Sequence, residues 1–115
     1  MTFLPQYTQL MLLNLERNEL QNKELMIQRR AMQYSKDAEF VEDFYSAQGI
    51  MDSTNYSVED QDYYKHLKRL SDQAETMKES YDTQISALDD MINSLQQQIK
   101  TGVQNDCGLT LTGGK

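Results

Sequence analysis

Residues 63–99 read YYKHLKRLSDQAETMKESYDTQISALDDMINSLQQQI, and this stretch decides the fold. An apolar residue recurs in it every three or four positions, and neither Gly nor Pro interrupts it. Such spacing places the recurring residues on one face of an α-helix. Two successive steps of four around Tyr81 predict a stutter, a local irregularity in any coiled coil that this face forms. The recurring residues are Tyr63, Leu67, Leu70, Ala74, Met77, Tyr81, Ile85, Leu88, Ile92, Leu95 and Ile99.

A second series of the same kind lies earlier in the chain and alternates strictly between steps of three and four. Its members are Leu10, Leu13, Arg17, Leu20, Glu24, Ile27, Ala31, Tyr34, Ala38, Val41 and Tyr45. Only Arg17 and Glu24 among them are charged. This is the heptad pattern of a coiled-coil helix with two charged positions in its contact face.

Residues that start or stop helices mark the ends of both series. Pro5 suits the first turn of a helix, and Gly49 suits the position just after a helix end. Residues 52–55 are all turn-forming. Ser57, which two acidic residues follow closely, is typical of a helix N-terminus.

We therefore predict one helix at about 5–47, a turn at about 48–57 and a second helix at about 58–101 that Gly102 ends. Two helices of matching length joined by a short turn predict an all-α fold, a long antiparallel two-helix hairpin of the coiled-coil type. Residues 102–115 are predicted to form a flexible, Gly-rich tail.

In such a hairpin the numbers of facing residues sum to about 105. Arg17 then lies beside Asp89, and Glu24 lies near Tyr81 and Lys78. We expect these five residues to set the register of the two helices rather than to add much stability, as polar residues in a coiled-coil contact face often do.

Apolar residues outside the two series are concentrated near the N-terminus. Two helices share only one contact face, so these residues have no place in the hairpin itself. We expect them to bind a partner, either a second copy of the chain or a helix of another protein. The candidate partner-binding residues are Leu4, Tyr7, Met11, Leu12, Leu15, Leu25 and Met32.

The charge is −7 overall, and residues 48–62 alone carry −4. An acidic surface disfavours binding to phosphate backbones and anionic lipids, so no nucleic-acid partner is expected.

The sequence also offers few residues for metal binding or catalysis. The single Cys excludes an internal disulfide, and the single His has no companion for metal binding or catalysis. The turn lacks the glycine and the last acid of a calcium loop. We expect no enzyme activity, no cofactor and no metal.

Residues 2–15 are the most apolar stretch, but no basic residue precedes them and no cleavage site follows them. They are also shorter than the roughly 20 residues that a membrane span needs. A cytoplasmic location is therefore expected, with export without a leader as the alternative.

In length and two-helix organisation the chain resembles the Trp-x-Gly family of small bacterial proteins, which are exported as helical hairpins without a leader. The corresponding turn here is Ser46-Ala47-Gln48-Gly49, and the chain has no Trp. The tail signal of that family, a Tyr followed four residues later by an acid, occurs only at Tyr56 and Asp60, in the turn. Needle subunits and chaperones of type III secretion share the general shape.

The expected function is a non-enzymatic coiled-coil structural or adaptor protein that acts by helix–helix association. The alternative is a leaderless secreted protein, or a subunit or chaperone of a bacterial secretion apparatus.

Overall fold

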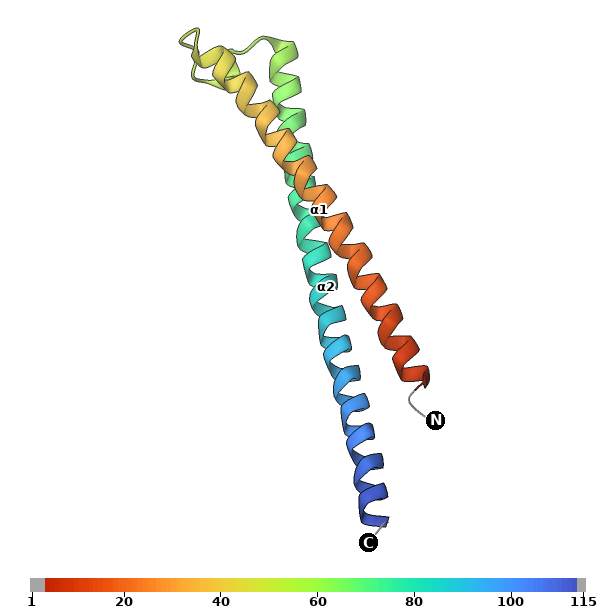
Figure 1. Cartoon of the computed structure of the whole chain (residues 1–115). Coiled ribbons are helices and arrows are strands. Elements are labelled where there is room, and N and C mark those ends of the chain that lie inside the picture. The colour runs from red at the N-terminus through yellow and green to blue at the C-terminus, as the bar shows by residue number, and fades with distance from the viewer. Residues whose placement is uncertain (1–3, 114–115) are drawn as a thin grey trace. The chain divides into compact units, whose positions relative to one another are not determined.

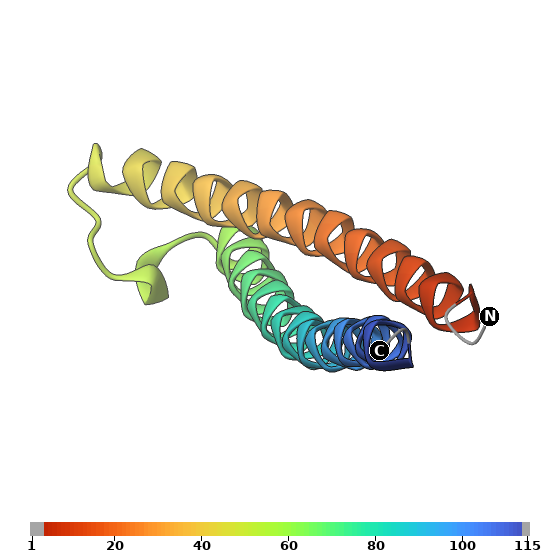
Figure 2. The same cartoon turned by 60° about the horizontal axis from the view of Figure 1, so that its bottom comes forward.

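The computed structural model describes the backbone of residues 4–113 and the side chains of residues 5–104. Its elements are α1 (Leu4–Ser46), one 3₁₀ turn η1 (Ser53–Asn55) and α2 (Val58–Gly113), with no strand among the described residues (Figure 1). The chain reverses direction through the segment that contains η1, which Figure 2 shows between the two helices. The predicted all-α hairpin is confirmed, whereas its completion by a second copy or a partner helix stays a prediction.

The chain forms two compact units, each with a part of both helices. Unit 1 comprises Met1–Gln21 and Thr83–Lys115, and unit 2 comprises Asn22–Asp82, which include the turn.

The core of unit 2 lies on one face of each helix. Near its middle, Ile27 and Ala31 of α1 pack against Ala74 of α2, with Tyr34 and Tyr81 against them. The buried residues of α1 here are spaced by the predicted steps of three and four, except for one gap of seven in which the half-buried Tyr34 lies. They are Ile27, Ala31, Ala38, Val41 and Tyr45, and those from the turn and α2 are Tyr56, Leu67 and Ala74.

The predicted contact face of α2 is wrong at two positions of unit 2. Tyr63 and Met77 are exposed, and the half-buried residues are the next ones along the chain, Tyr64 and Lys78. The step from Lys78 to Tyr81 is three, and the half-buried Ser71 takes the position before Ala74, so the series alternates strictly and the predicted stutter around Tyr81 is absent. Tyr and Lys suit such positions because the ring or the aliphatic stem packs against the neighbouring helix while the polar tip reaches water.

Unit 1 buries more of α2 than of α1. Its buried residues are Leu20 of α1 and Ile85, Leu88, Ile92, Leu95 and Ile99 of α2. Leu10 and Leu13 occupy the predicted contact face of α1 but are only half-buried. The apolar surface of unit 1 is therefore incompletely covered.

Contacts between the helices follow the predicted register in each unit. In unit 1, the Arg17 guanidinium donates to the Asp89 carboxylate. In unit 2, the Ser35 and Ser71 hydroxyls lie 3.4 Å apart, and the Tyr64 hydroxyl donates to Glu42. The residue numbers of each of these pairs sum to 106.

α1 ends in a Schellman motif, as the glycine at position 49 suggested. Gly49 has φ = +80°, a conformation that side chains with a Cβ atom disfavour. Its N–H donates to the Ser46 carbonyl at 2.9 Å, and the Ile50 N–H donates to the Tyr45 carbonyl at 2.9 Å. Ile50 then packs beside Tyr45, which is the apolar contact typical of this motif.

Side-chain caps start η1 and α2. The Asp52 carboxylate accepts a hydrogen bond from the Thr54 N–H at 3.0 Å, which lowers the pKa of Asp52. The Ser57 hydroxyl accepts from the Asp60 N–H at 3.2 Å and so caps α2 as predicted. The Gln61 amide joins the two elements by donating to the carbonyls of Thr54 and Tyr56.

α2 continues past Gly102, where the sequence predicted its end, and stops at Gly113. A single internal glycine lowers helix stability by about 1 kcal/mol relative to Ala, which does not by itself end a helix. In the register of unit 1, residue 102 faces Leu4, so residues 103–113 extend beyond the start of α1. Residues 102–113 of the predicted flexible tail are thus helical, and residues 114–115 lie outside the described residues.

We expect Gly49→Ala and Gly102→Ala to change stability in opposite directions. No atom lies within 4 Å of a Cβ added at Gly49, so Gly49→Ala strains only the backbone, by about 1 kcal/mol. Gly102→Ala improves helix propensity and raises the free energy of unfolding by about 0.5–1 kcal/mol. Urea denaturation at fixed protein concentration, followed by circular dichroism, measures both. If both substitutions stabilised the protein, or both destabilised it, the assignment of Gly49 to the C-terminal end of α1 would be contradicted.

Candidate interaction surfaces

The first predicted register contact is present in unit 1. The Arg17 guanidinium and the Asp89 carboxylate form an ion pair, with side chains 29% and 42% exposed. An ion pair this accessible contributes at most about 1 kcal/mol. Its role in fixing register stays a prediction.

The second register contact, in unit 2, has a partner that the sequence pattern missed. Half-buried Glu24 shares a hydrogen bond with the Asp82 carboxyl group, and this bond, burial and the Asp82 charge all raise the pKa of Glu24. The Lys78 ammonium lowers the pKa of Glu24. Lys78, the neighbour that the sequence predicted, is therefore present, and its effect on this pKa is the smallest of the four. Tyr81 instead packs against the Ile27 cluster.

The predicted partner-binding residues of unit 1 are exposed. Tyr7, Met11, Leu12 and Leu15 are each 50–57% exposed, and we call these four the neutral surface. Residues 5–15 of α1 carry no charge, and residues 91–104 of α2 carry one, Lys100. The side chain of Leu4 lies outside the described residues.

The remaining predicted partner-binding residues belong to unit 2. Leu25 and Met32 are 52% and 54% exposed. They are seven positions apart and so lie on one strip of α1, two helical turns from each other.

The turn end of unit 2 is held by three tyrosines. The Tyr45 and Tyr56 rings stack with centroids 4.1 Å apart, and Tyr64 meets Tyr56 edge-on at 5.9 Å. The Tyr45 hydroxyl donates to the Asp60 carboxylate and accepts from the Ser57 N–H at 3.2 Å. Stacking and hydrogen bonds together fix the direction in which the chain enters α2.

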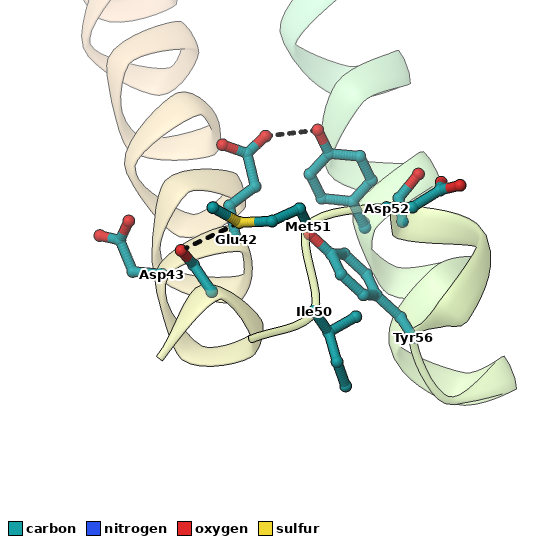
Figure 3. Close-up of a pocket in the computed structure, with 9 residues that line it drawn as sticks. Glu42, Asp43, Ile50, Met51, Asp52 and Tyr56 are labelled. Atoms are coloured by element: carbon teal, nitrogen blue, oxygen red, sulfur yellow. Dashed lines mark hydrogen bonds between the residues drawn. The ribbon is translucent and has the colours of Figure 1, made fainter. Parts of the chain in front are cut away.

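A hollow of about 570 Å³ opens beside these tyrosines. Figure 3 shows Met51 lying across it, with its sulfur toward Ser46, which donates to it at 3.4 Å. Glu42, one turn before Ser46 in α1, accepts a hydrogen bond from the Tyr64 hydroxyl, which raises the pKa of Tyr64 to about 12. Three carboxylates and no basic group line this hollow. The lining residues are Glu42, Asp43, Ser46, Ile50, Met51, Asp52, Ser53, Tyr56 and Tyr64.

A second hollow of unit 2, the aromatic groove, was not anticipated from the sequence. Phe40 and Phe44 of α1 and Tyr63 of α2 line it, with Val41 and Tyr45 at its base and Asp37 and Asp60 also in its lining. Its volume is about 380 Å³. Two phenylalanines four positions apart and outside the heptad series were the signal that could have revealed it.

Among the described residues, no group of three or more His, Cys, Asp and Glu side chains could hold a metal ion. His66 is exposed, and the side chain of Cys107 lies outside the described part. Nor does any described helix have the length and apolar character that crossing a membrane requires. The expected compartment stays a prediction, as does the expected lack of enzyme activity.

No protein-family model, no curated protein and no solved structure matches this chain.

Tyr45→Phe should lower the free energy of unfolding by about 1–3 kcal/mol, because it leaves the Ser57 N–H and the Asp60 carboxylate without the hydroxyl they share. Tyr63→Phe is the matched control, because Tyr63 is exposed. This substitution should change the free energy of unfolding by less than about 0.5 kcal/mol. Urea denaturation compares the two. An equal loss in both variants would mean that the Tyr45 hydroxyl does not secure the turn.

Glu24→Gln should raise thermal stability at neutral pH. Since the pKa of Glu24 is raised in the folded protein, its contribution is full below the unfolded pKa near 4.5 and is lost as pH rises through the folded value. The amide keeps a hydrogen bond to Asp82 without the like charge, a gain of about 0.5 kcal/mol. Thermal denaturation from about pH 4, near the ordinary pKa of a Glu carboxyl group, to about pH 8 should show the difference only at the higher pH.

Glu39→Gln is the control for general charge repulsion, because Glu39 is exposed on the same helix and the net charge changes equally. A gain of the same size in both variants would contradict a specific Glu24–Asp82 contact.

Proposed function

We propose that the protein is a non-enzymatic coiled-coil structural or adaptor protein that associates with a second copy of itself through the neutral surface of unit 1. The observation that carries the proposal is the exposure of Tyr7, Met11, Leu12 and Leu15 on a segment without any charge. The two-helix hairpin is compatible with this role.

The chemistry of the neutral surface is that of an interface core. In the cores of protein–protein interfaces, charged residues are depleted, while aromatic residues and Met are enriched. Tyr7 and Met11 fit this composition, and residues 5–15 lack charge altogether. Burying one such side chain contributes about 1.5–3 kcal/mol, so four of them supply enough for association to offset part of its entropic cost.

The contact face of unit 1 is itself incompletely covered. Leu10 and Leu13 lie on the contact face with α2 and are nevertheless half-buried. A twofold pair would use the same surface on both copies.

Leu15→Asp should weaken self-association at least about tenfold, because it places a charge in a surface that is buried in the pair. Sedimentation velocity at a low and a high protein concentration measures the change, with circular dichroism as the check on helicity. Asn22→Asp is the matched control, because Asn22 is exposed one heptad further along α1 and gains the same charge.

The proposal predicts a concentration-dependent assembly that Leu15→Asp dissolves and Asn22→Asp leaves intact, with helicity unchanged in both. A wild-type chain that sediments as a monomer at every concentration would refute it. Loss of helicity in Leu15→Asp would also refute it, since Leu15 would then belong to the core of the hairpin.

A further inference from the structure

The aromatic groove of unit 2 exposes apolar side chains that the hairpin does not use. Phe40 is 74% exposed, Phe44 52% and Tyr63 48%. Phe40 and Phe44 are four positions apart and therefore lie on one side of α1, and Tyr63 joins them from α2. Exposed aromatic side chains gathered around one hollow are typical of a binding surface.

The base of the groove is rigid. Val41 and Tyr45 are buried, and the Phe44 ring meets the Tyr45 ring edge-on with centroids 5.3 Å apart. Tyr45 is in turn held by its stack on Tyr56 and its hydrogen bond to Asp60. A preformed hollow of this kind loses little conformational freedom when it is filled.

The surroundings of the groove are strongly acidic. Residues 37–64 contain eight Asp or Glu and no Lys, Arg or His. Two of these acids, Asp37 and Asp60, line the groove itself. All eleven Lys and Arg residues of the chain lie outside this segment. The apolar hollow therefore lies in an acidic segment, and among its eight carboxylates Glu42 has a basic neighbour, the Lys68 ammonium at 3.9 Å.

We propose that the aromatic groove binds a basic amphipathic helix of another protein, which inserts an aromatic or aliphatic side chain between Phe40, Phe44 and Tyr63 and places Lys or Arg beside Asp37. This inference goes beyond the self-association proposed for unit 1, because it concerns a different surface and a different partner.

The charge argues for this partner over the others. A nucleic acid or an anionic lipid surface would be repelled by the eight carboxylates. A Lys or Arg side chain meets a carboxylate at Asp37 and an aromatic face at Phe40 or Tyr63, so it gains a charge pair and a cation–π contact together. A helix presents apolar anchors at intervals of three or four residues with charges beside them, which is the pattern that this groove fits.

The test is a selection from a phage-displayed library of randomised peptides, about 16 residues long so that a bound peptide can span several helical turns, on the full-length protein. Peptides that also bind the Phe40→Ala variant are removed in each round. We expect the enriched peptides to carry net positive charge around two or more large apolar residues, and no other class to be enriched.

Variants then localise the binding of the selected peptide, measured by fluorescence anisotropy. Phe40→Ala should weaken it about tenfold, and Met26→Ala, exposed at the same heptad position of α1, should leave it unchanged. Asp37→Asn should weaken it about threefold at low salt, and Asp90→Asn, exposed in unit 1, should not. Added salt should weaken binding to the wild type and have less effect on Asp37→Asn.

Three results would overturn the proposal. One is the enrichment of neutral or acidic peptides, or of none. Another is an equal loss of peptide binding in Phe40→Ala and Met26→Ala. The third is a loss of self-association in Phe40→Ala, because the groove would then hold a second copy of this chain. Leu15→Asp should leave peptide binding unchanged, so the two proposals fail independently.

Discussion

The contact face between α1 and α2 is the constraint on which the structure depends. A pair of helices shares one such face, and every buried side chain described in either unit lies on it or beside the turn that joins the helices. The remaining surface of each helix is exposed, which is why a chain with 38% hydrophobic residues suffices for the fold. Large apolar residues away from this face are therefore not explained by the packing of the hairpin.

The contact face tolerates polar residues because their stems pack while their tips reach water. Arg17 extends to Asp89, Lys78 lies near Glu24, and Tyr64 donates to Glu42. Each places a polar group at the edge of the face, where a specific partner from the other helix is within reach. Apolar contacts hold the two helices together, and these polar contacts recur in the same register in each unit.

The sequence predicted the contact face of α1 well because one series in it alternates strictly between steps of three and four. In α2, Tyr63 and Met77 lie next to the true contact positions, Tyr64 and Lys78. Hydrophobicity favoured Met77 over Lys78, and it does not distinguish one of the two adjacent tyrosines from the other. Which of two adjacent residues of α2 faces α1 depends on how the two helices pack, and the pattern within one helix does not contain that information. Asp82 as the partner of Glu24 and the aromatic groove were missed for the same reason, since each combines residues from both helices.

The segment of α2 beyond the start of α1 has a consequence for the chain as a whole. Residues 103–113 would extend about 16 Å as a helix, and an isolated helix of this length is marginal in water. No basic residue lies in its last turn to complement the negative end of the helix dipole. α1 begins at Leu4, opposite residue 102, so α1 itself gives this segment of α2 no packing surface along most of its length.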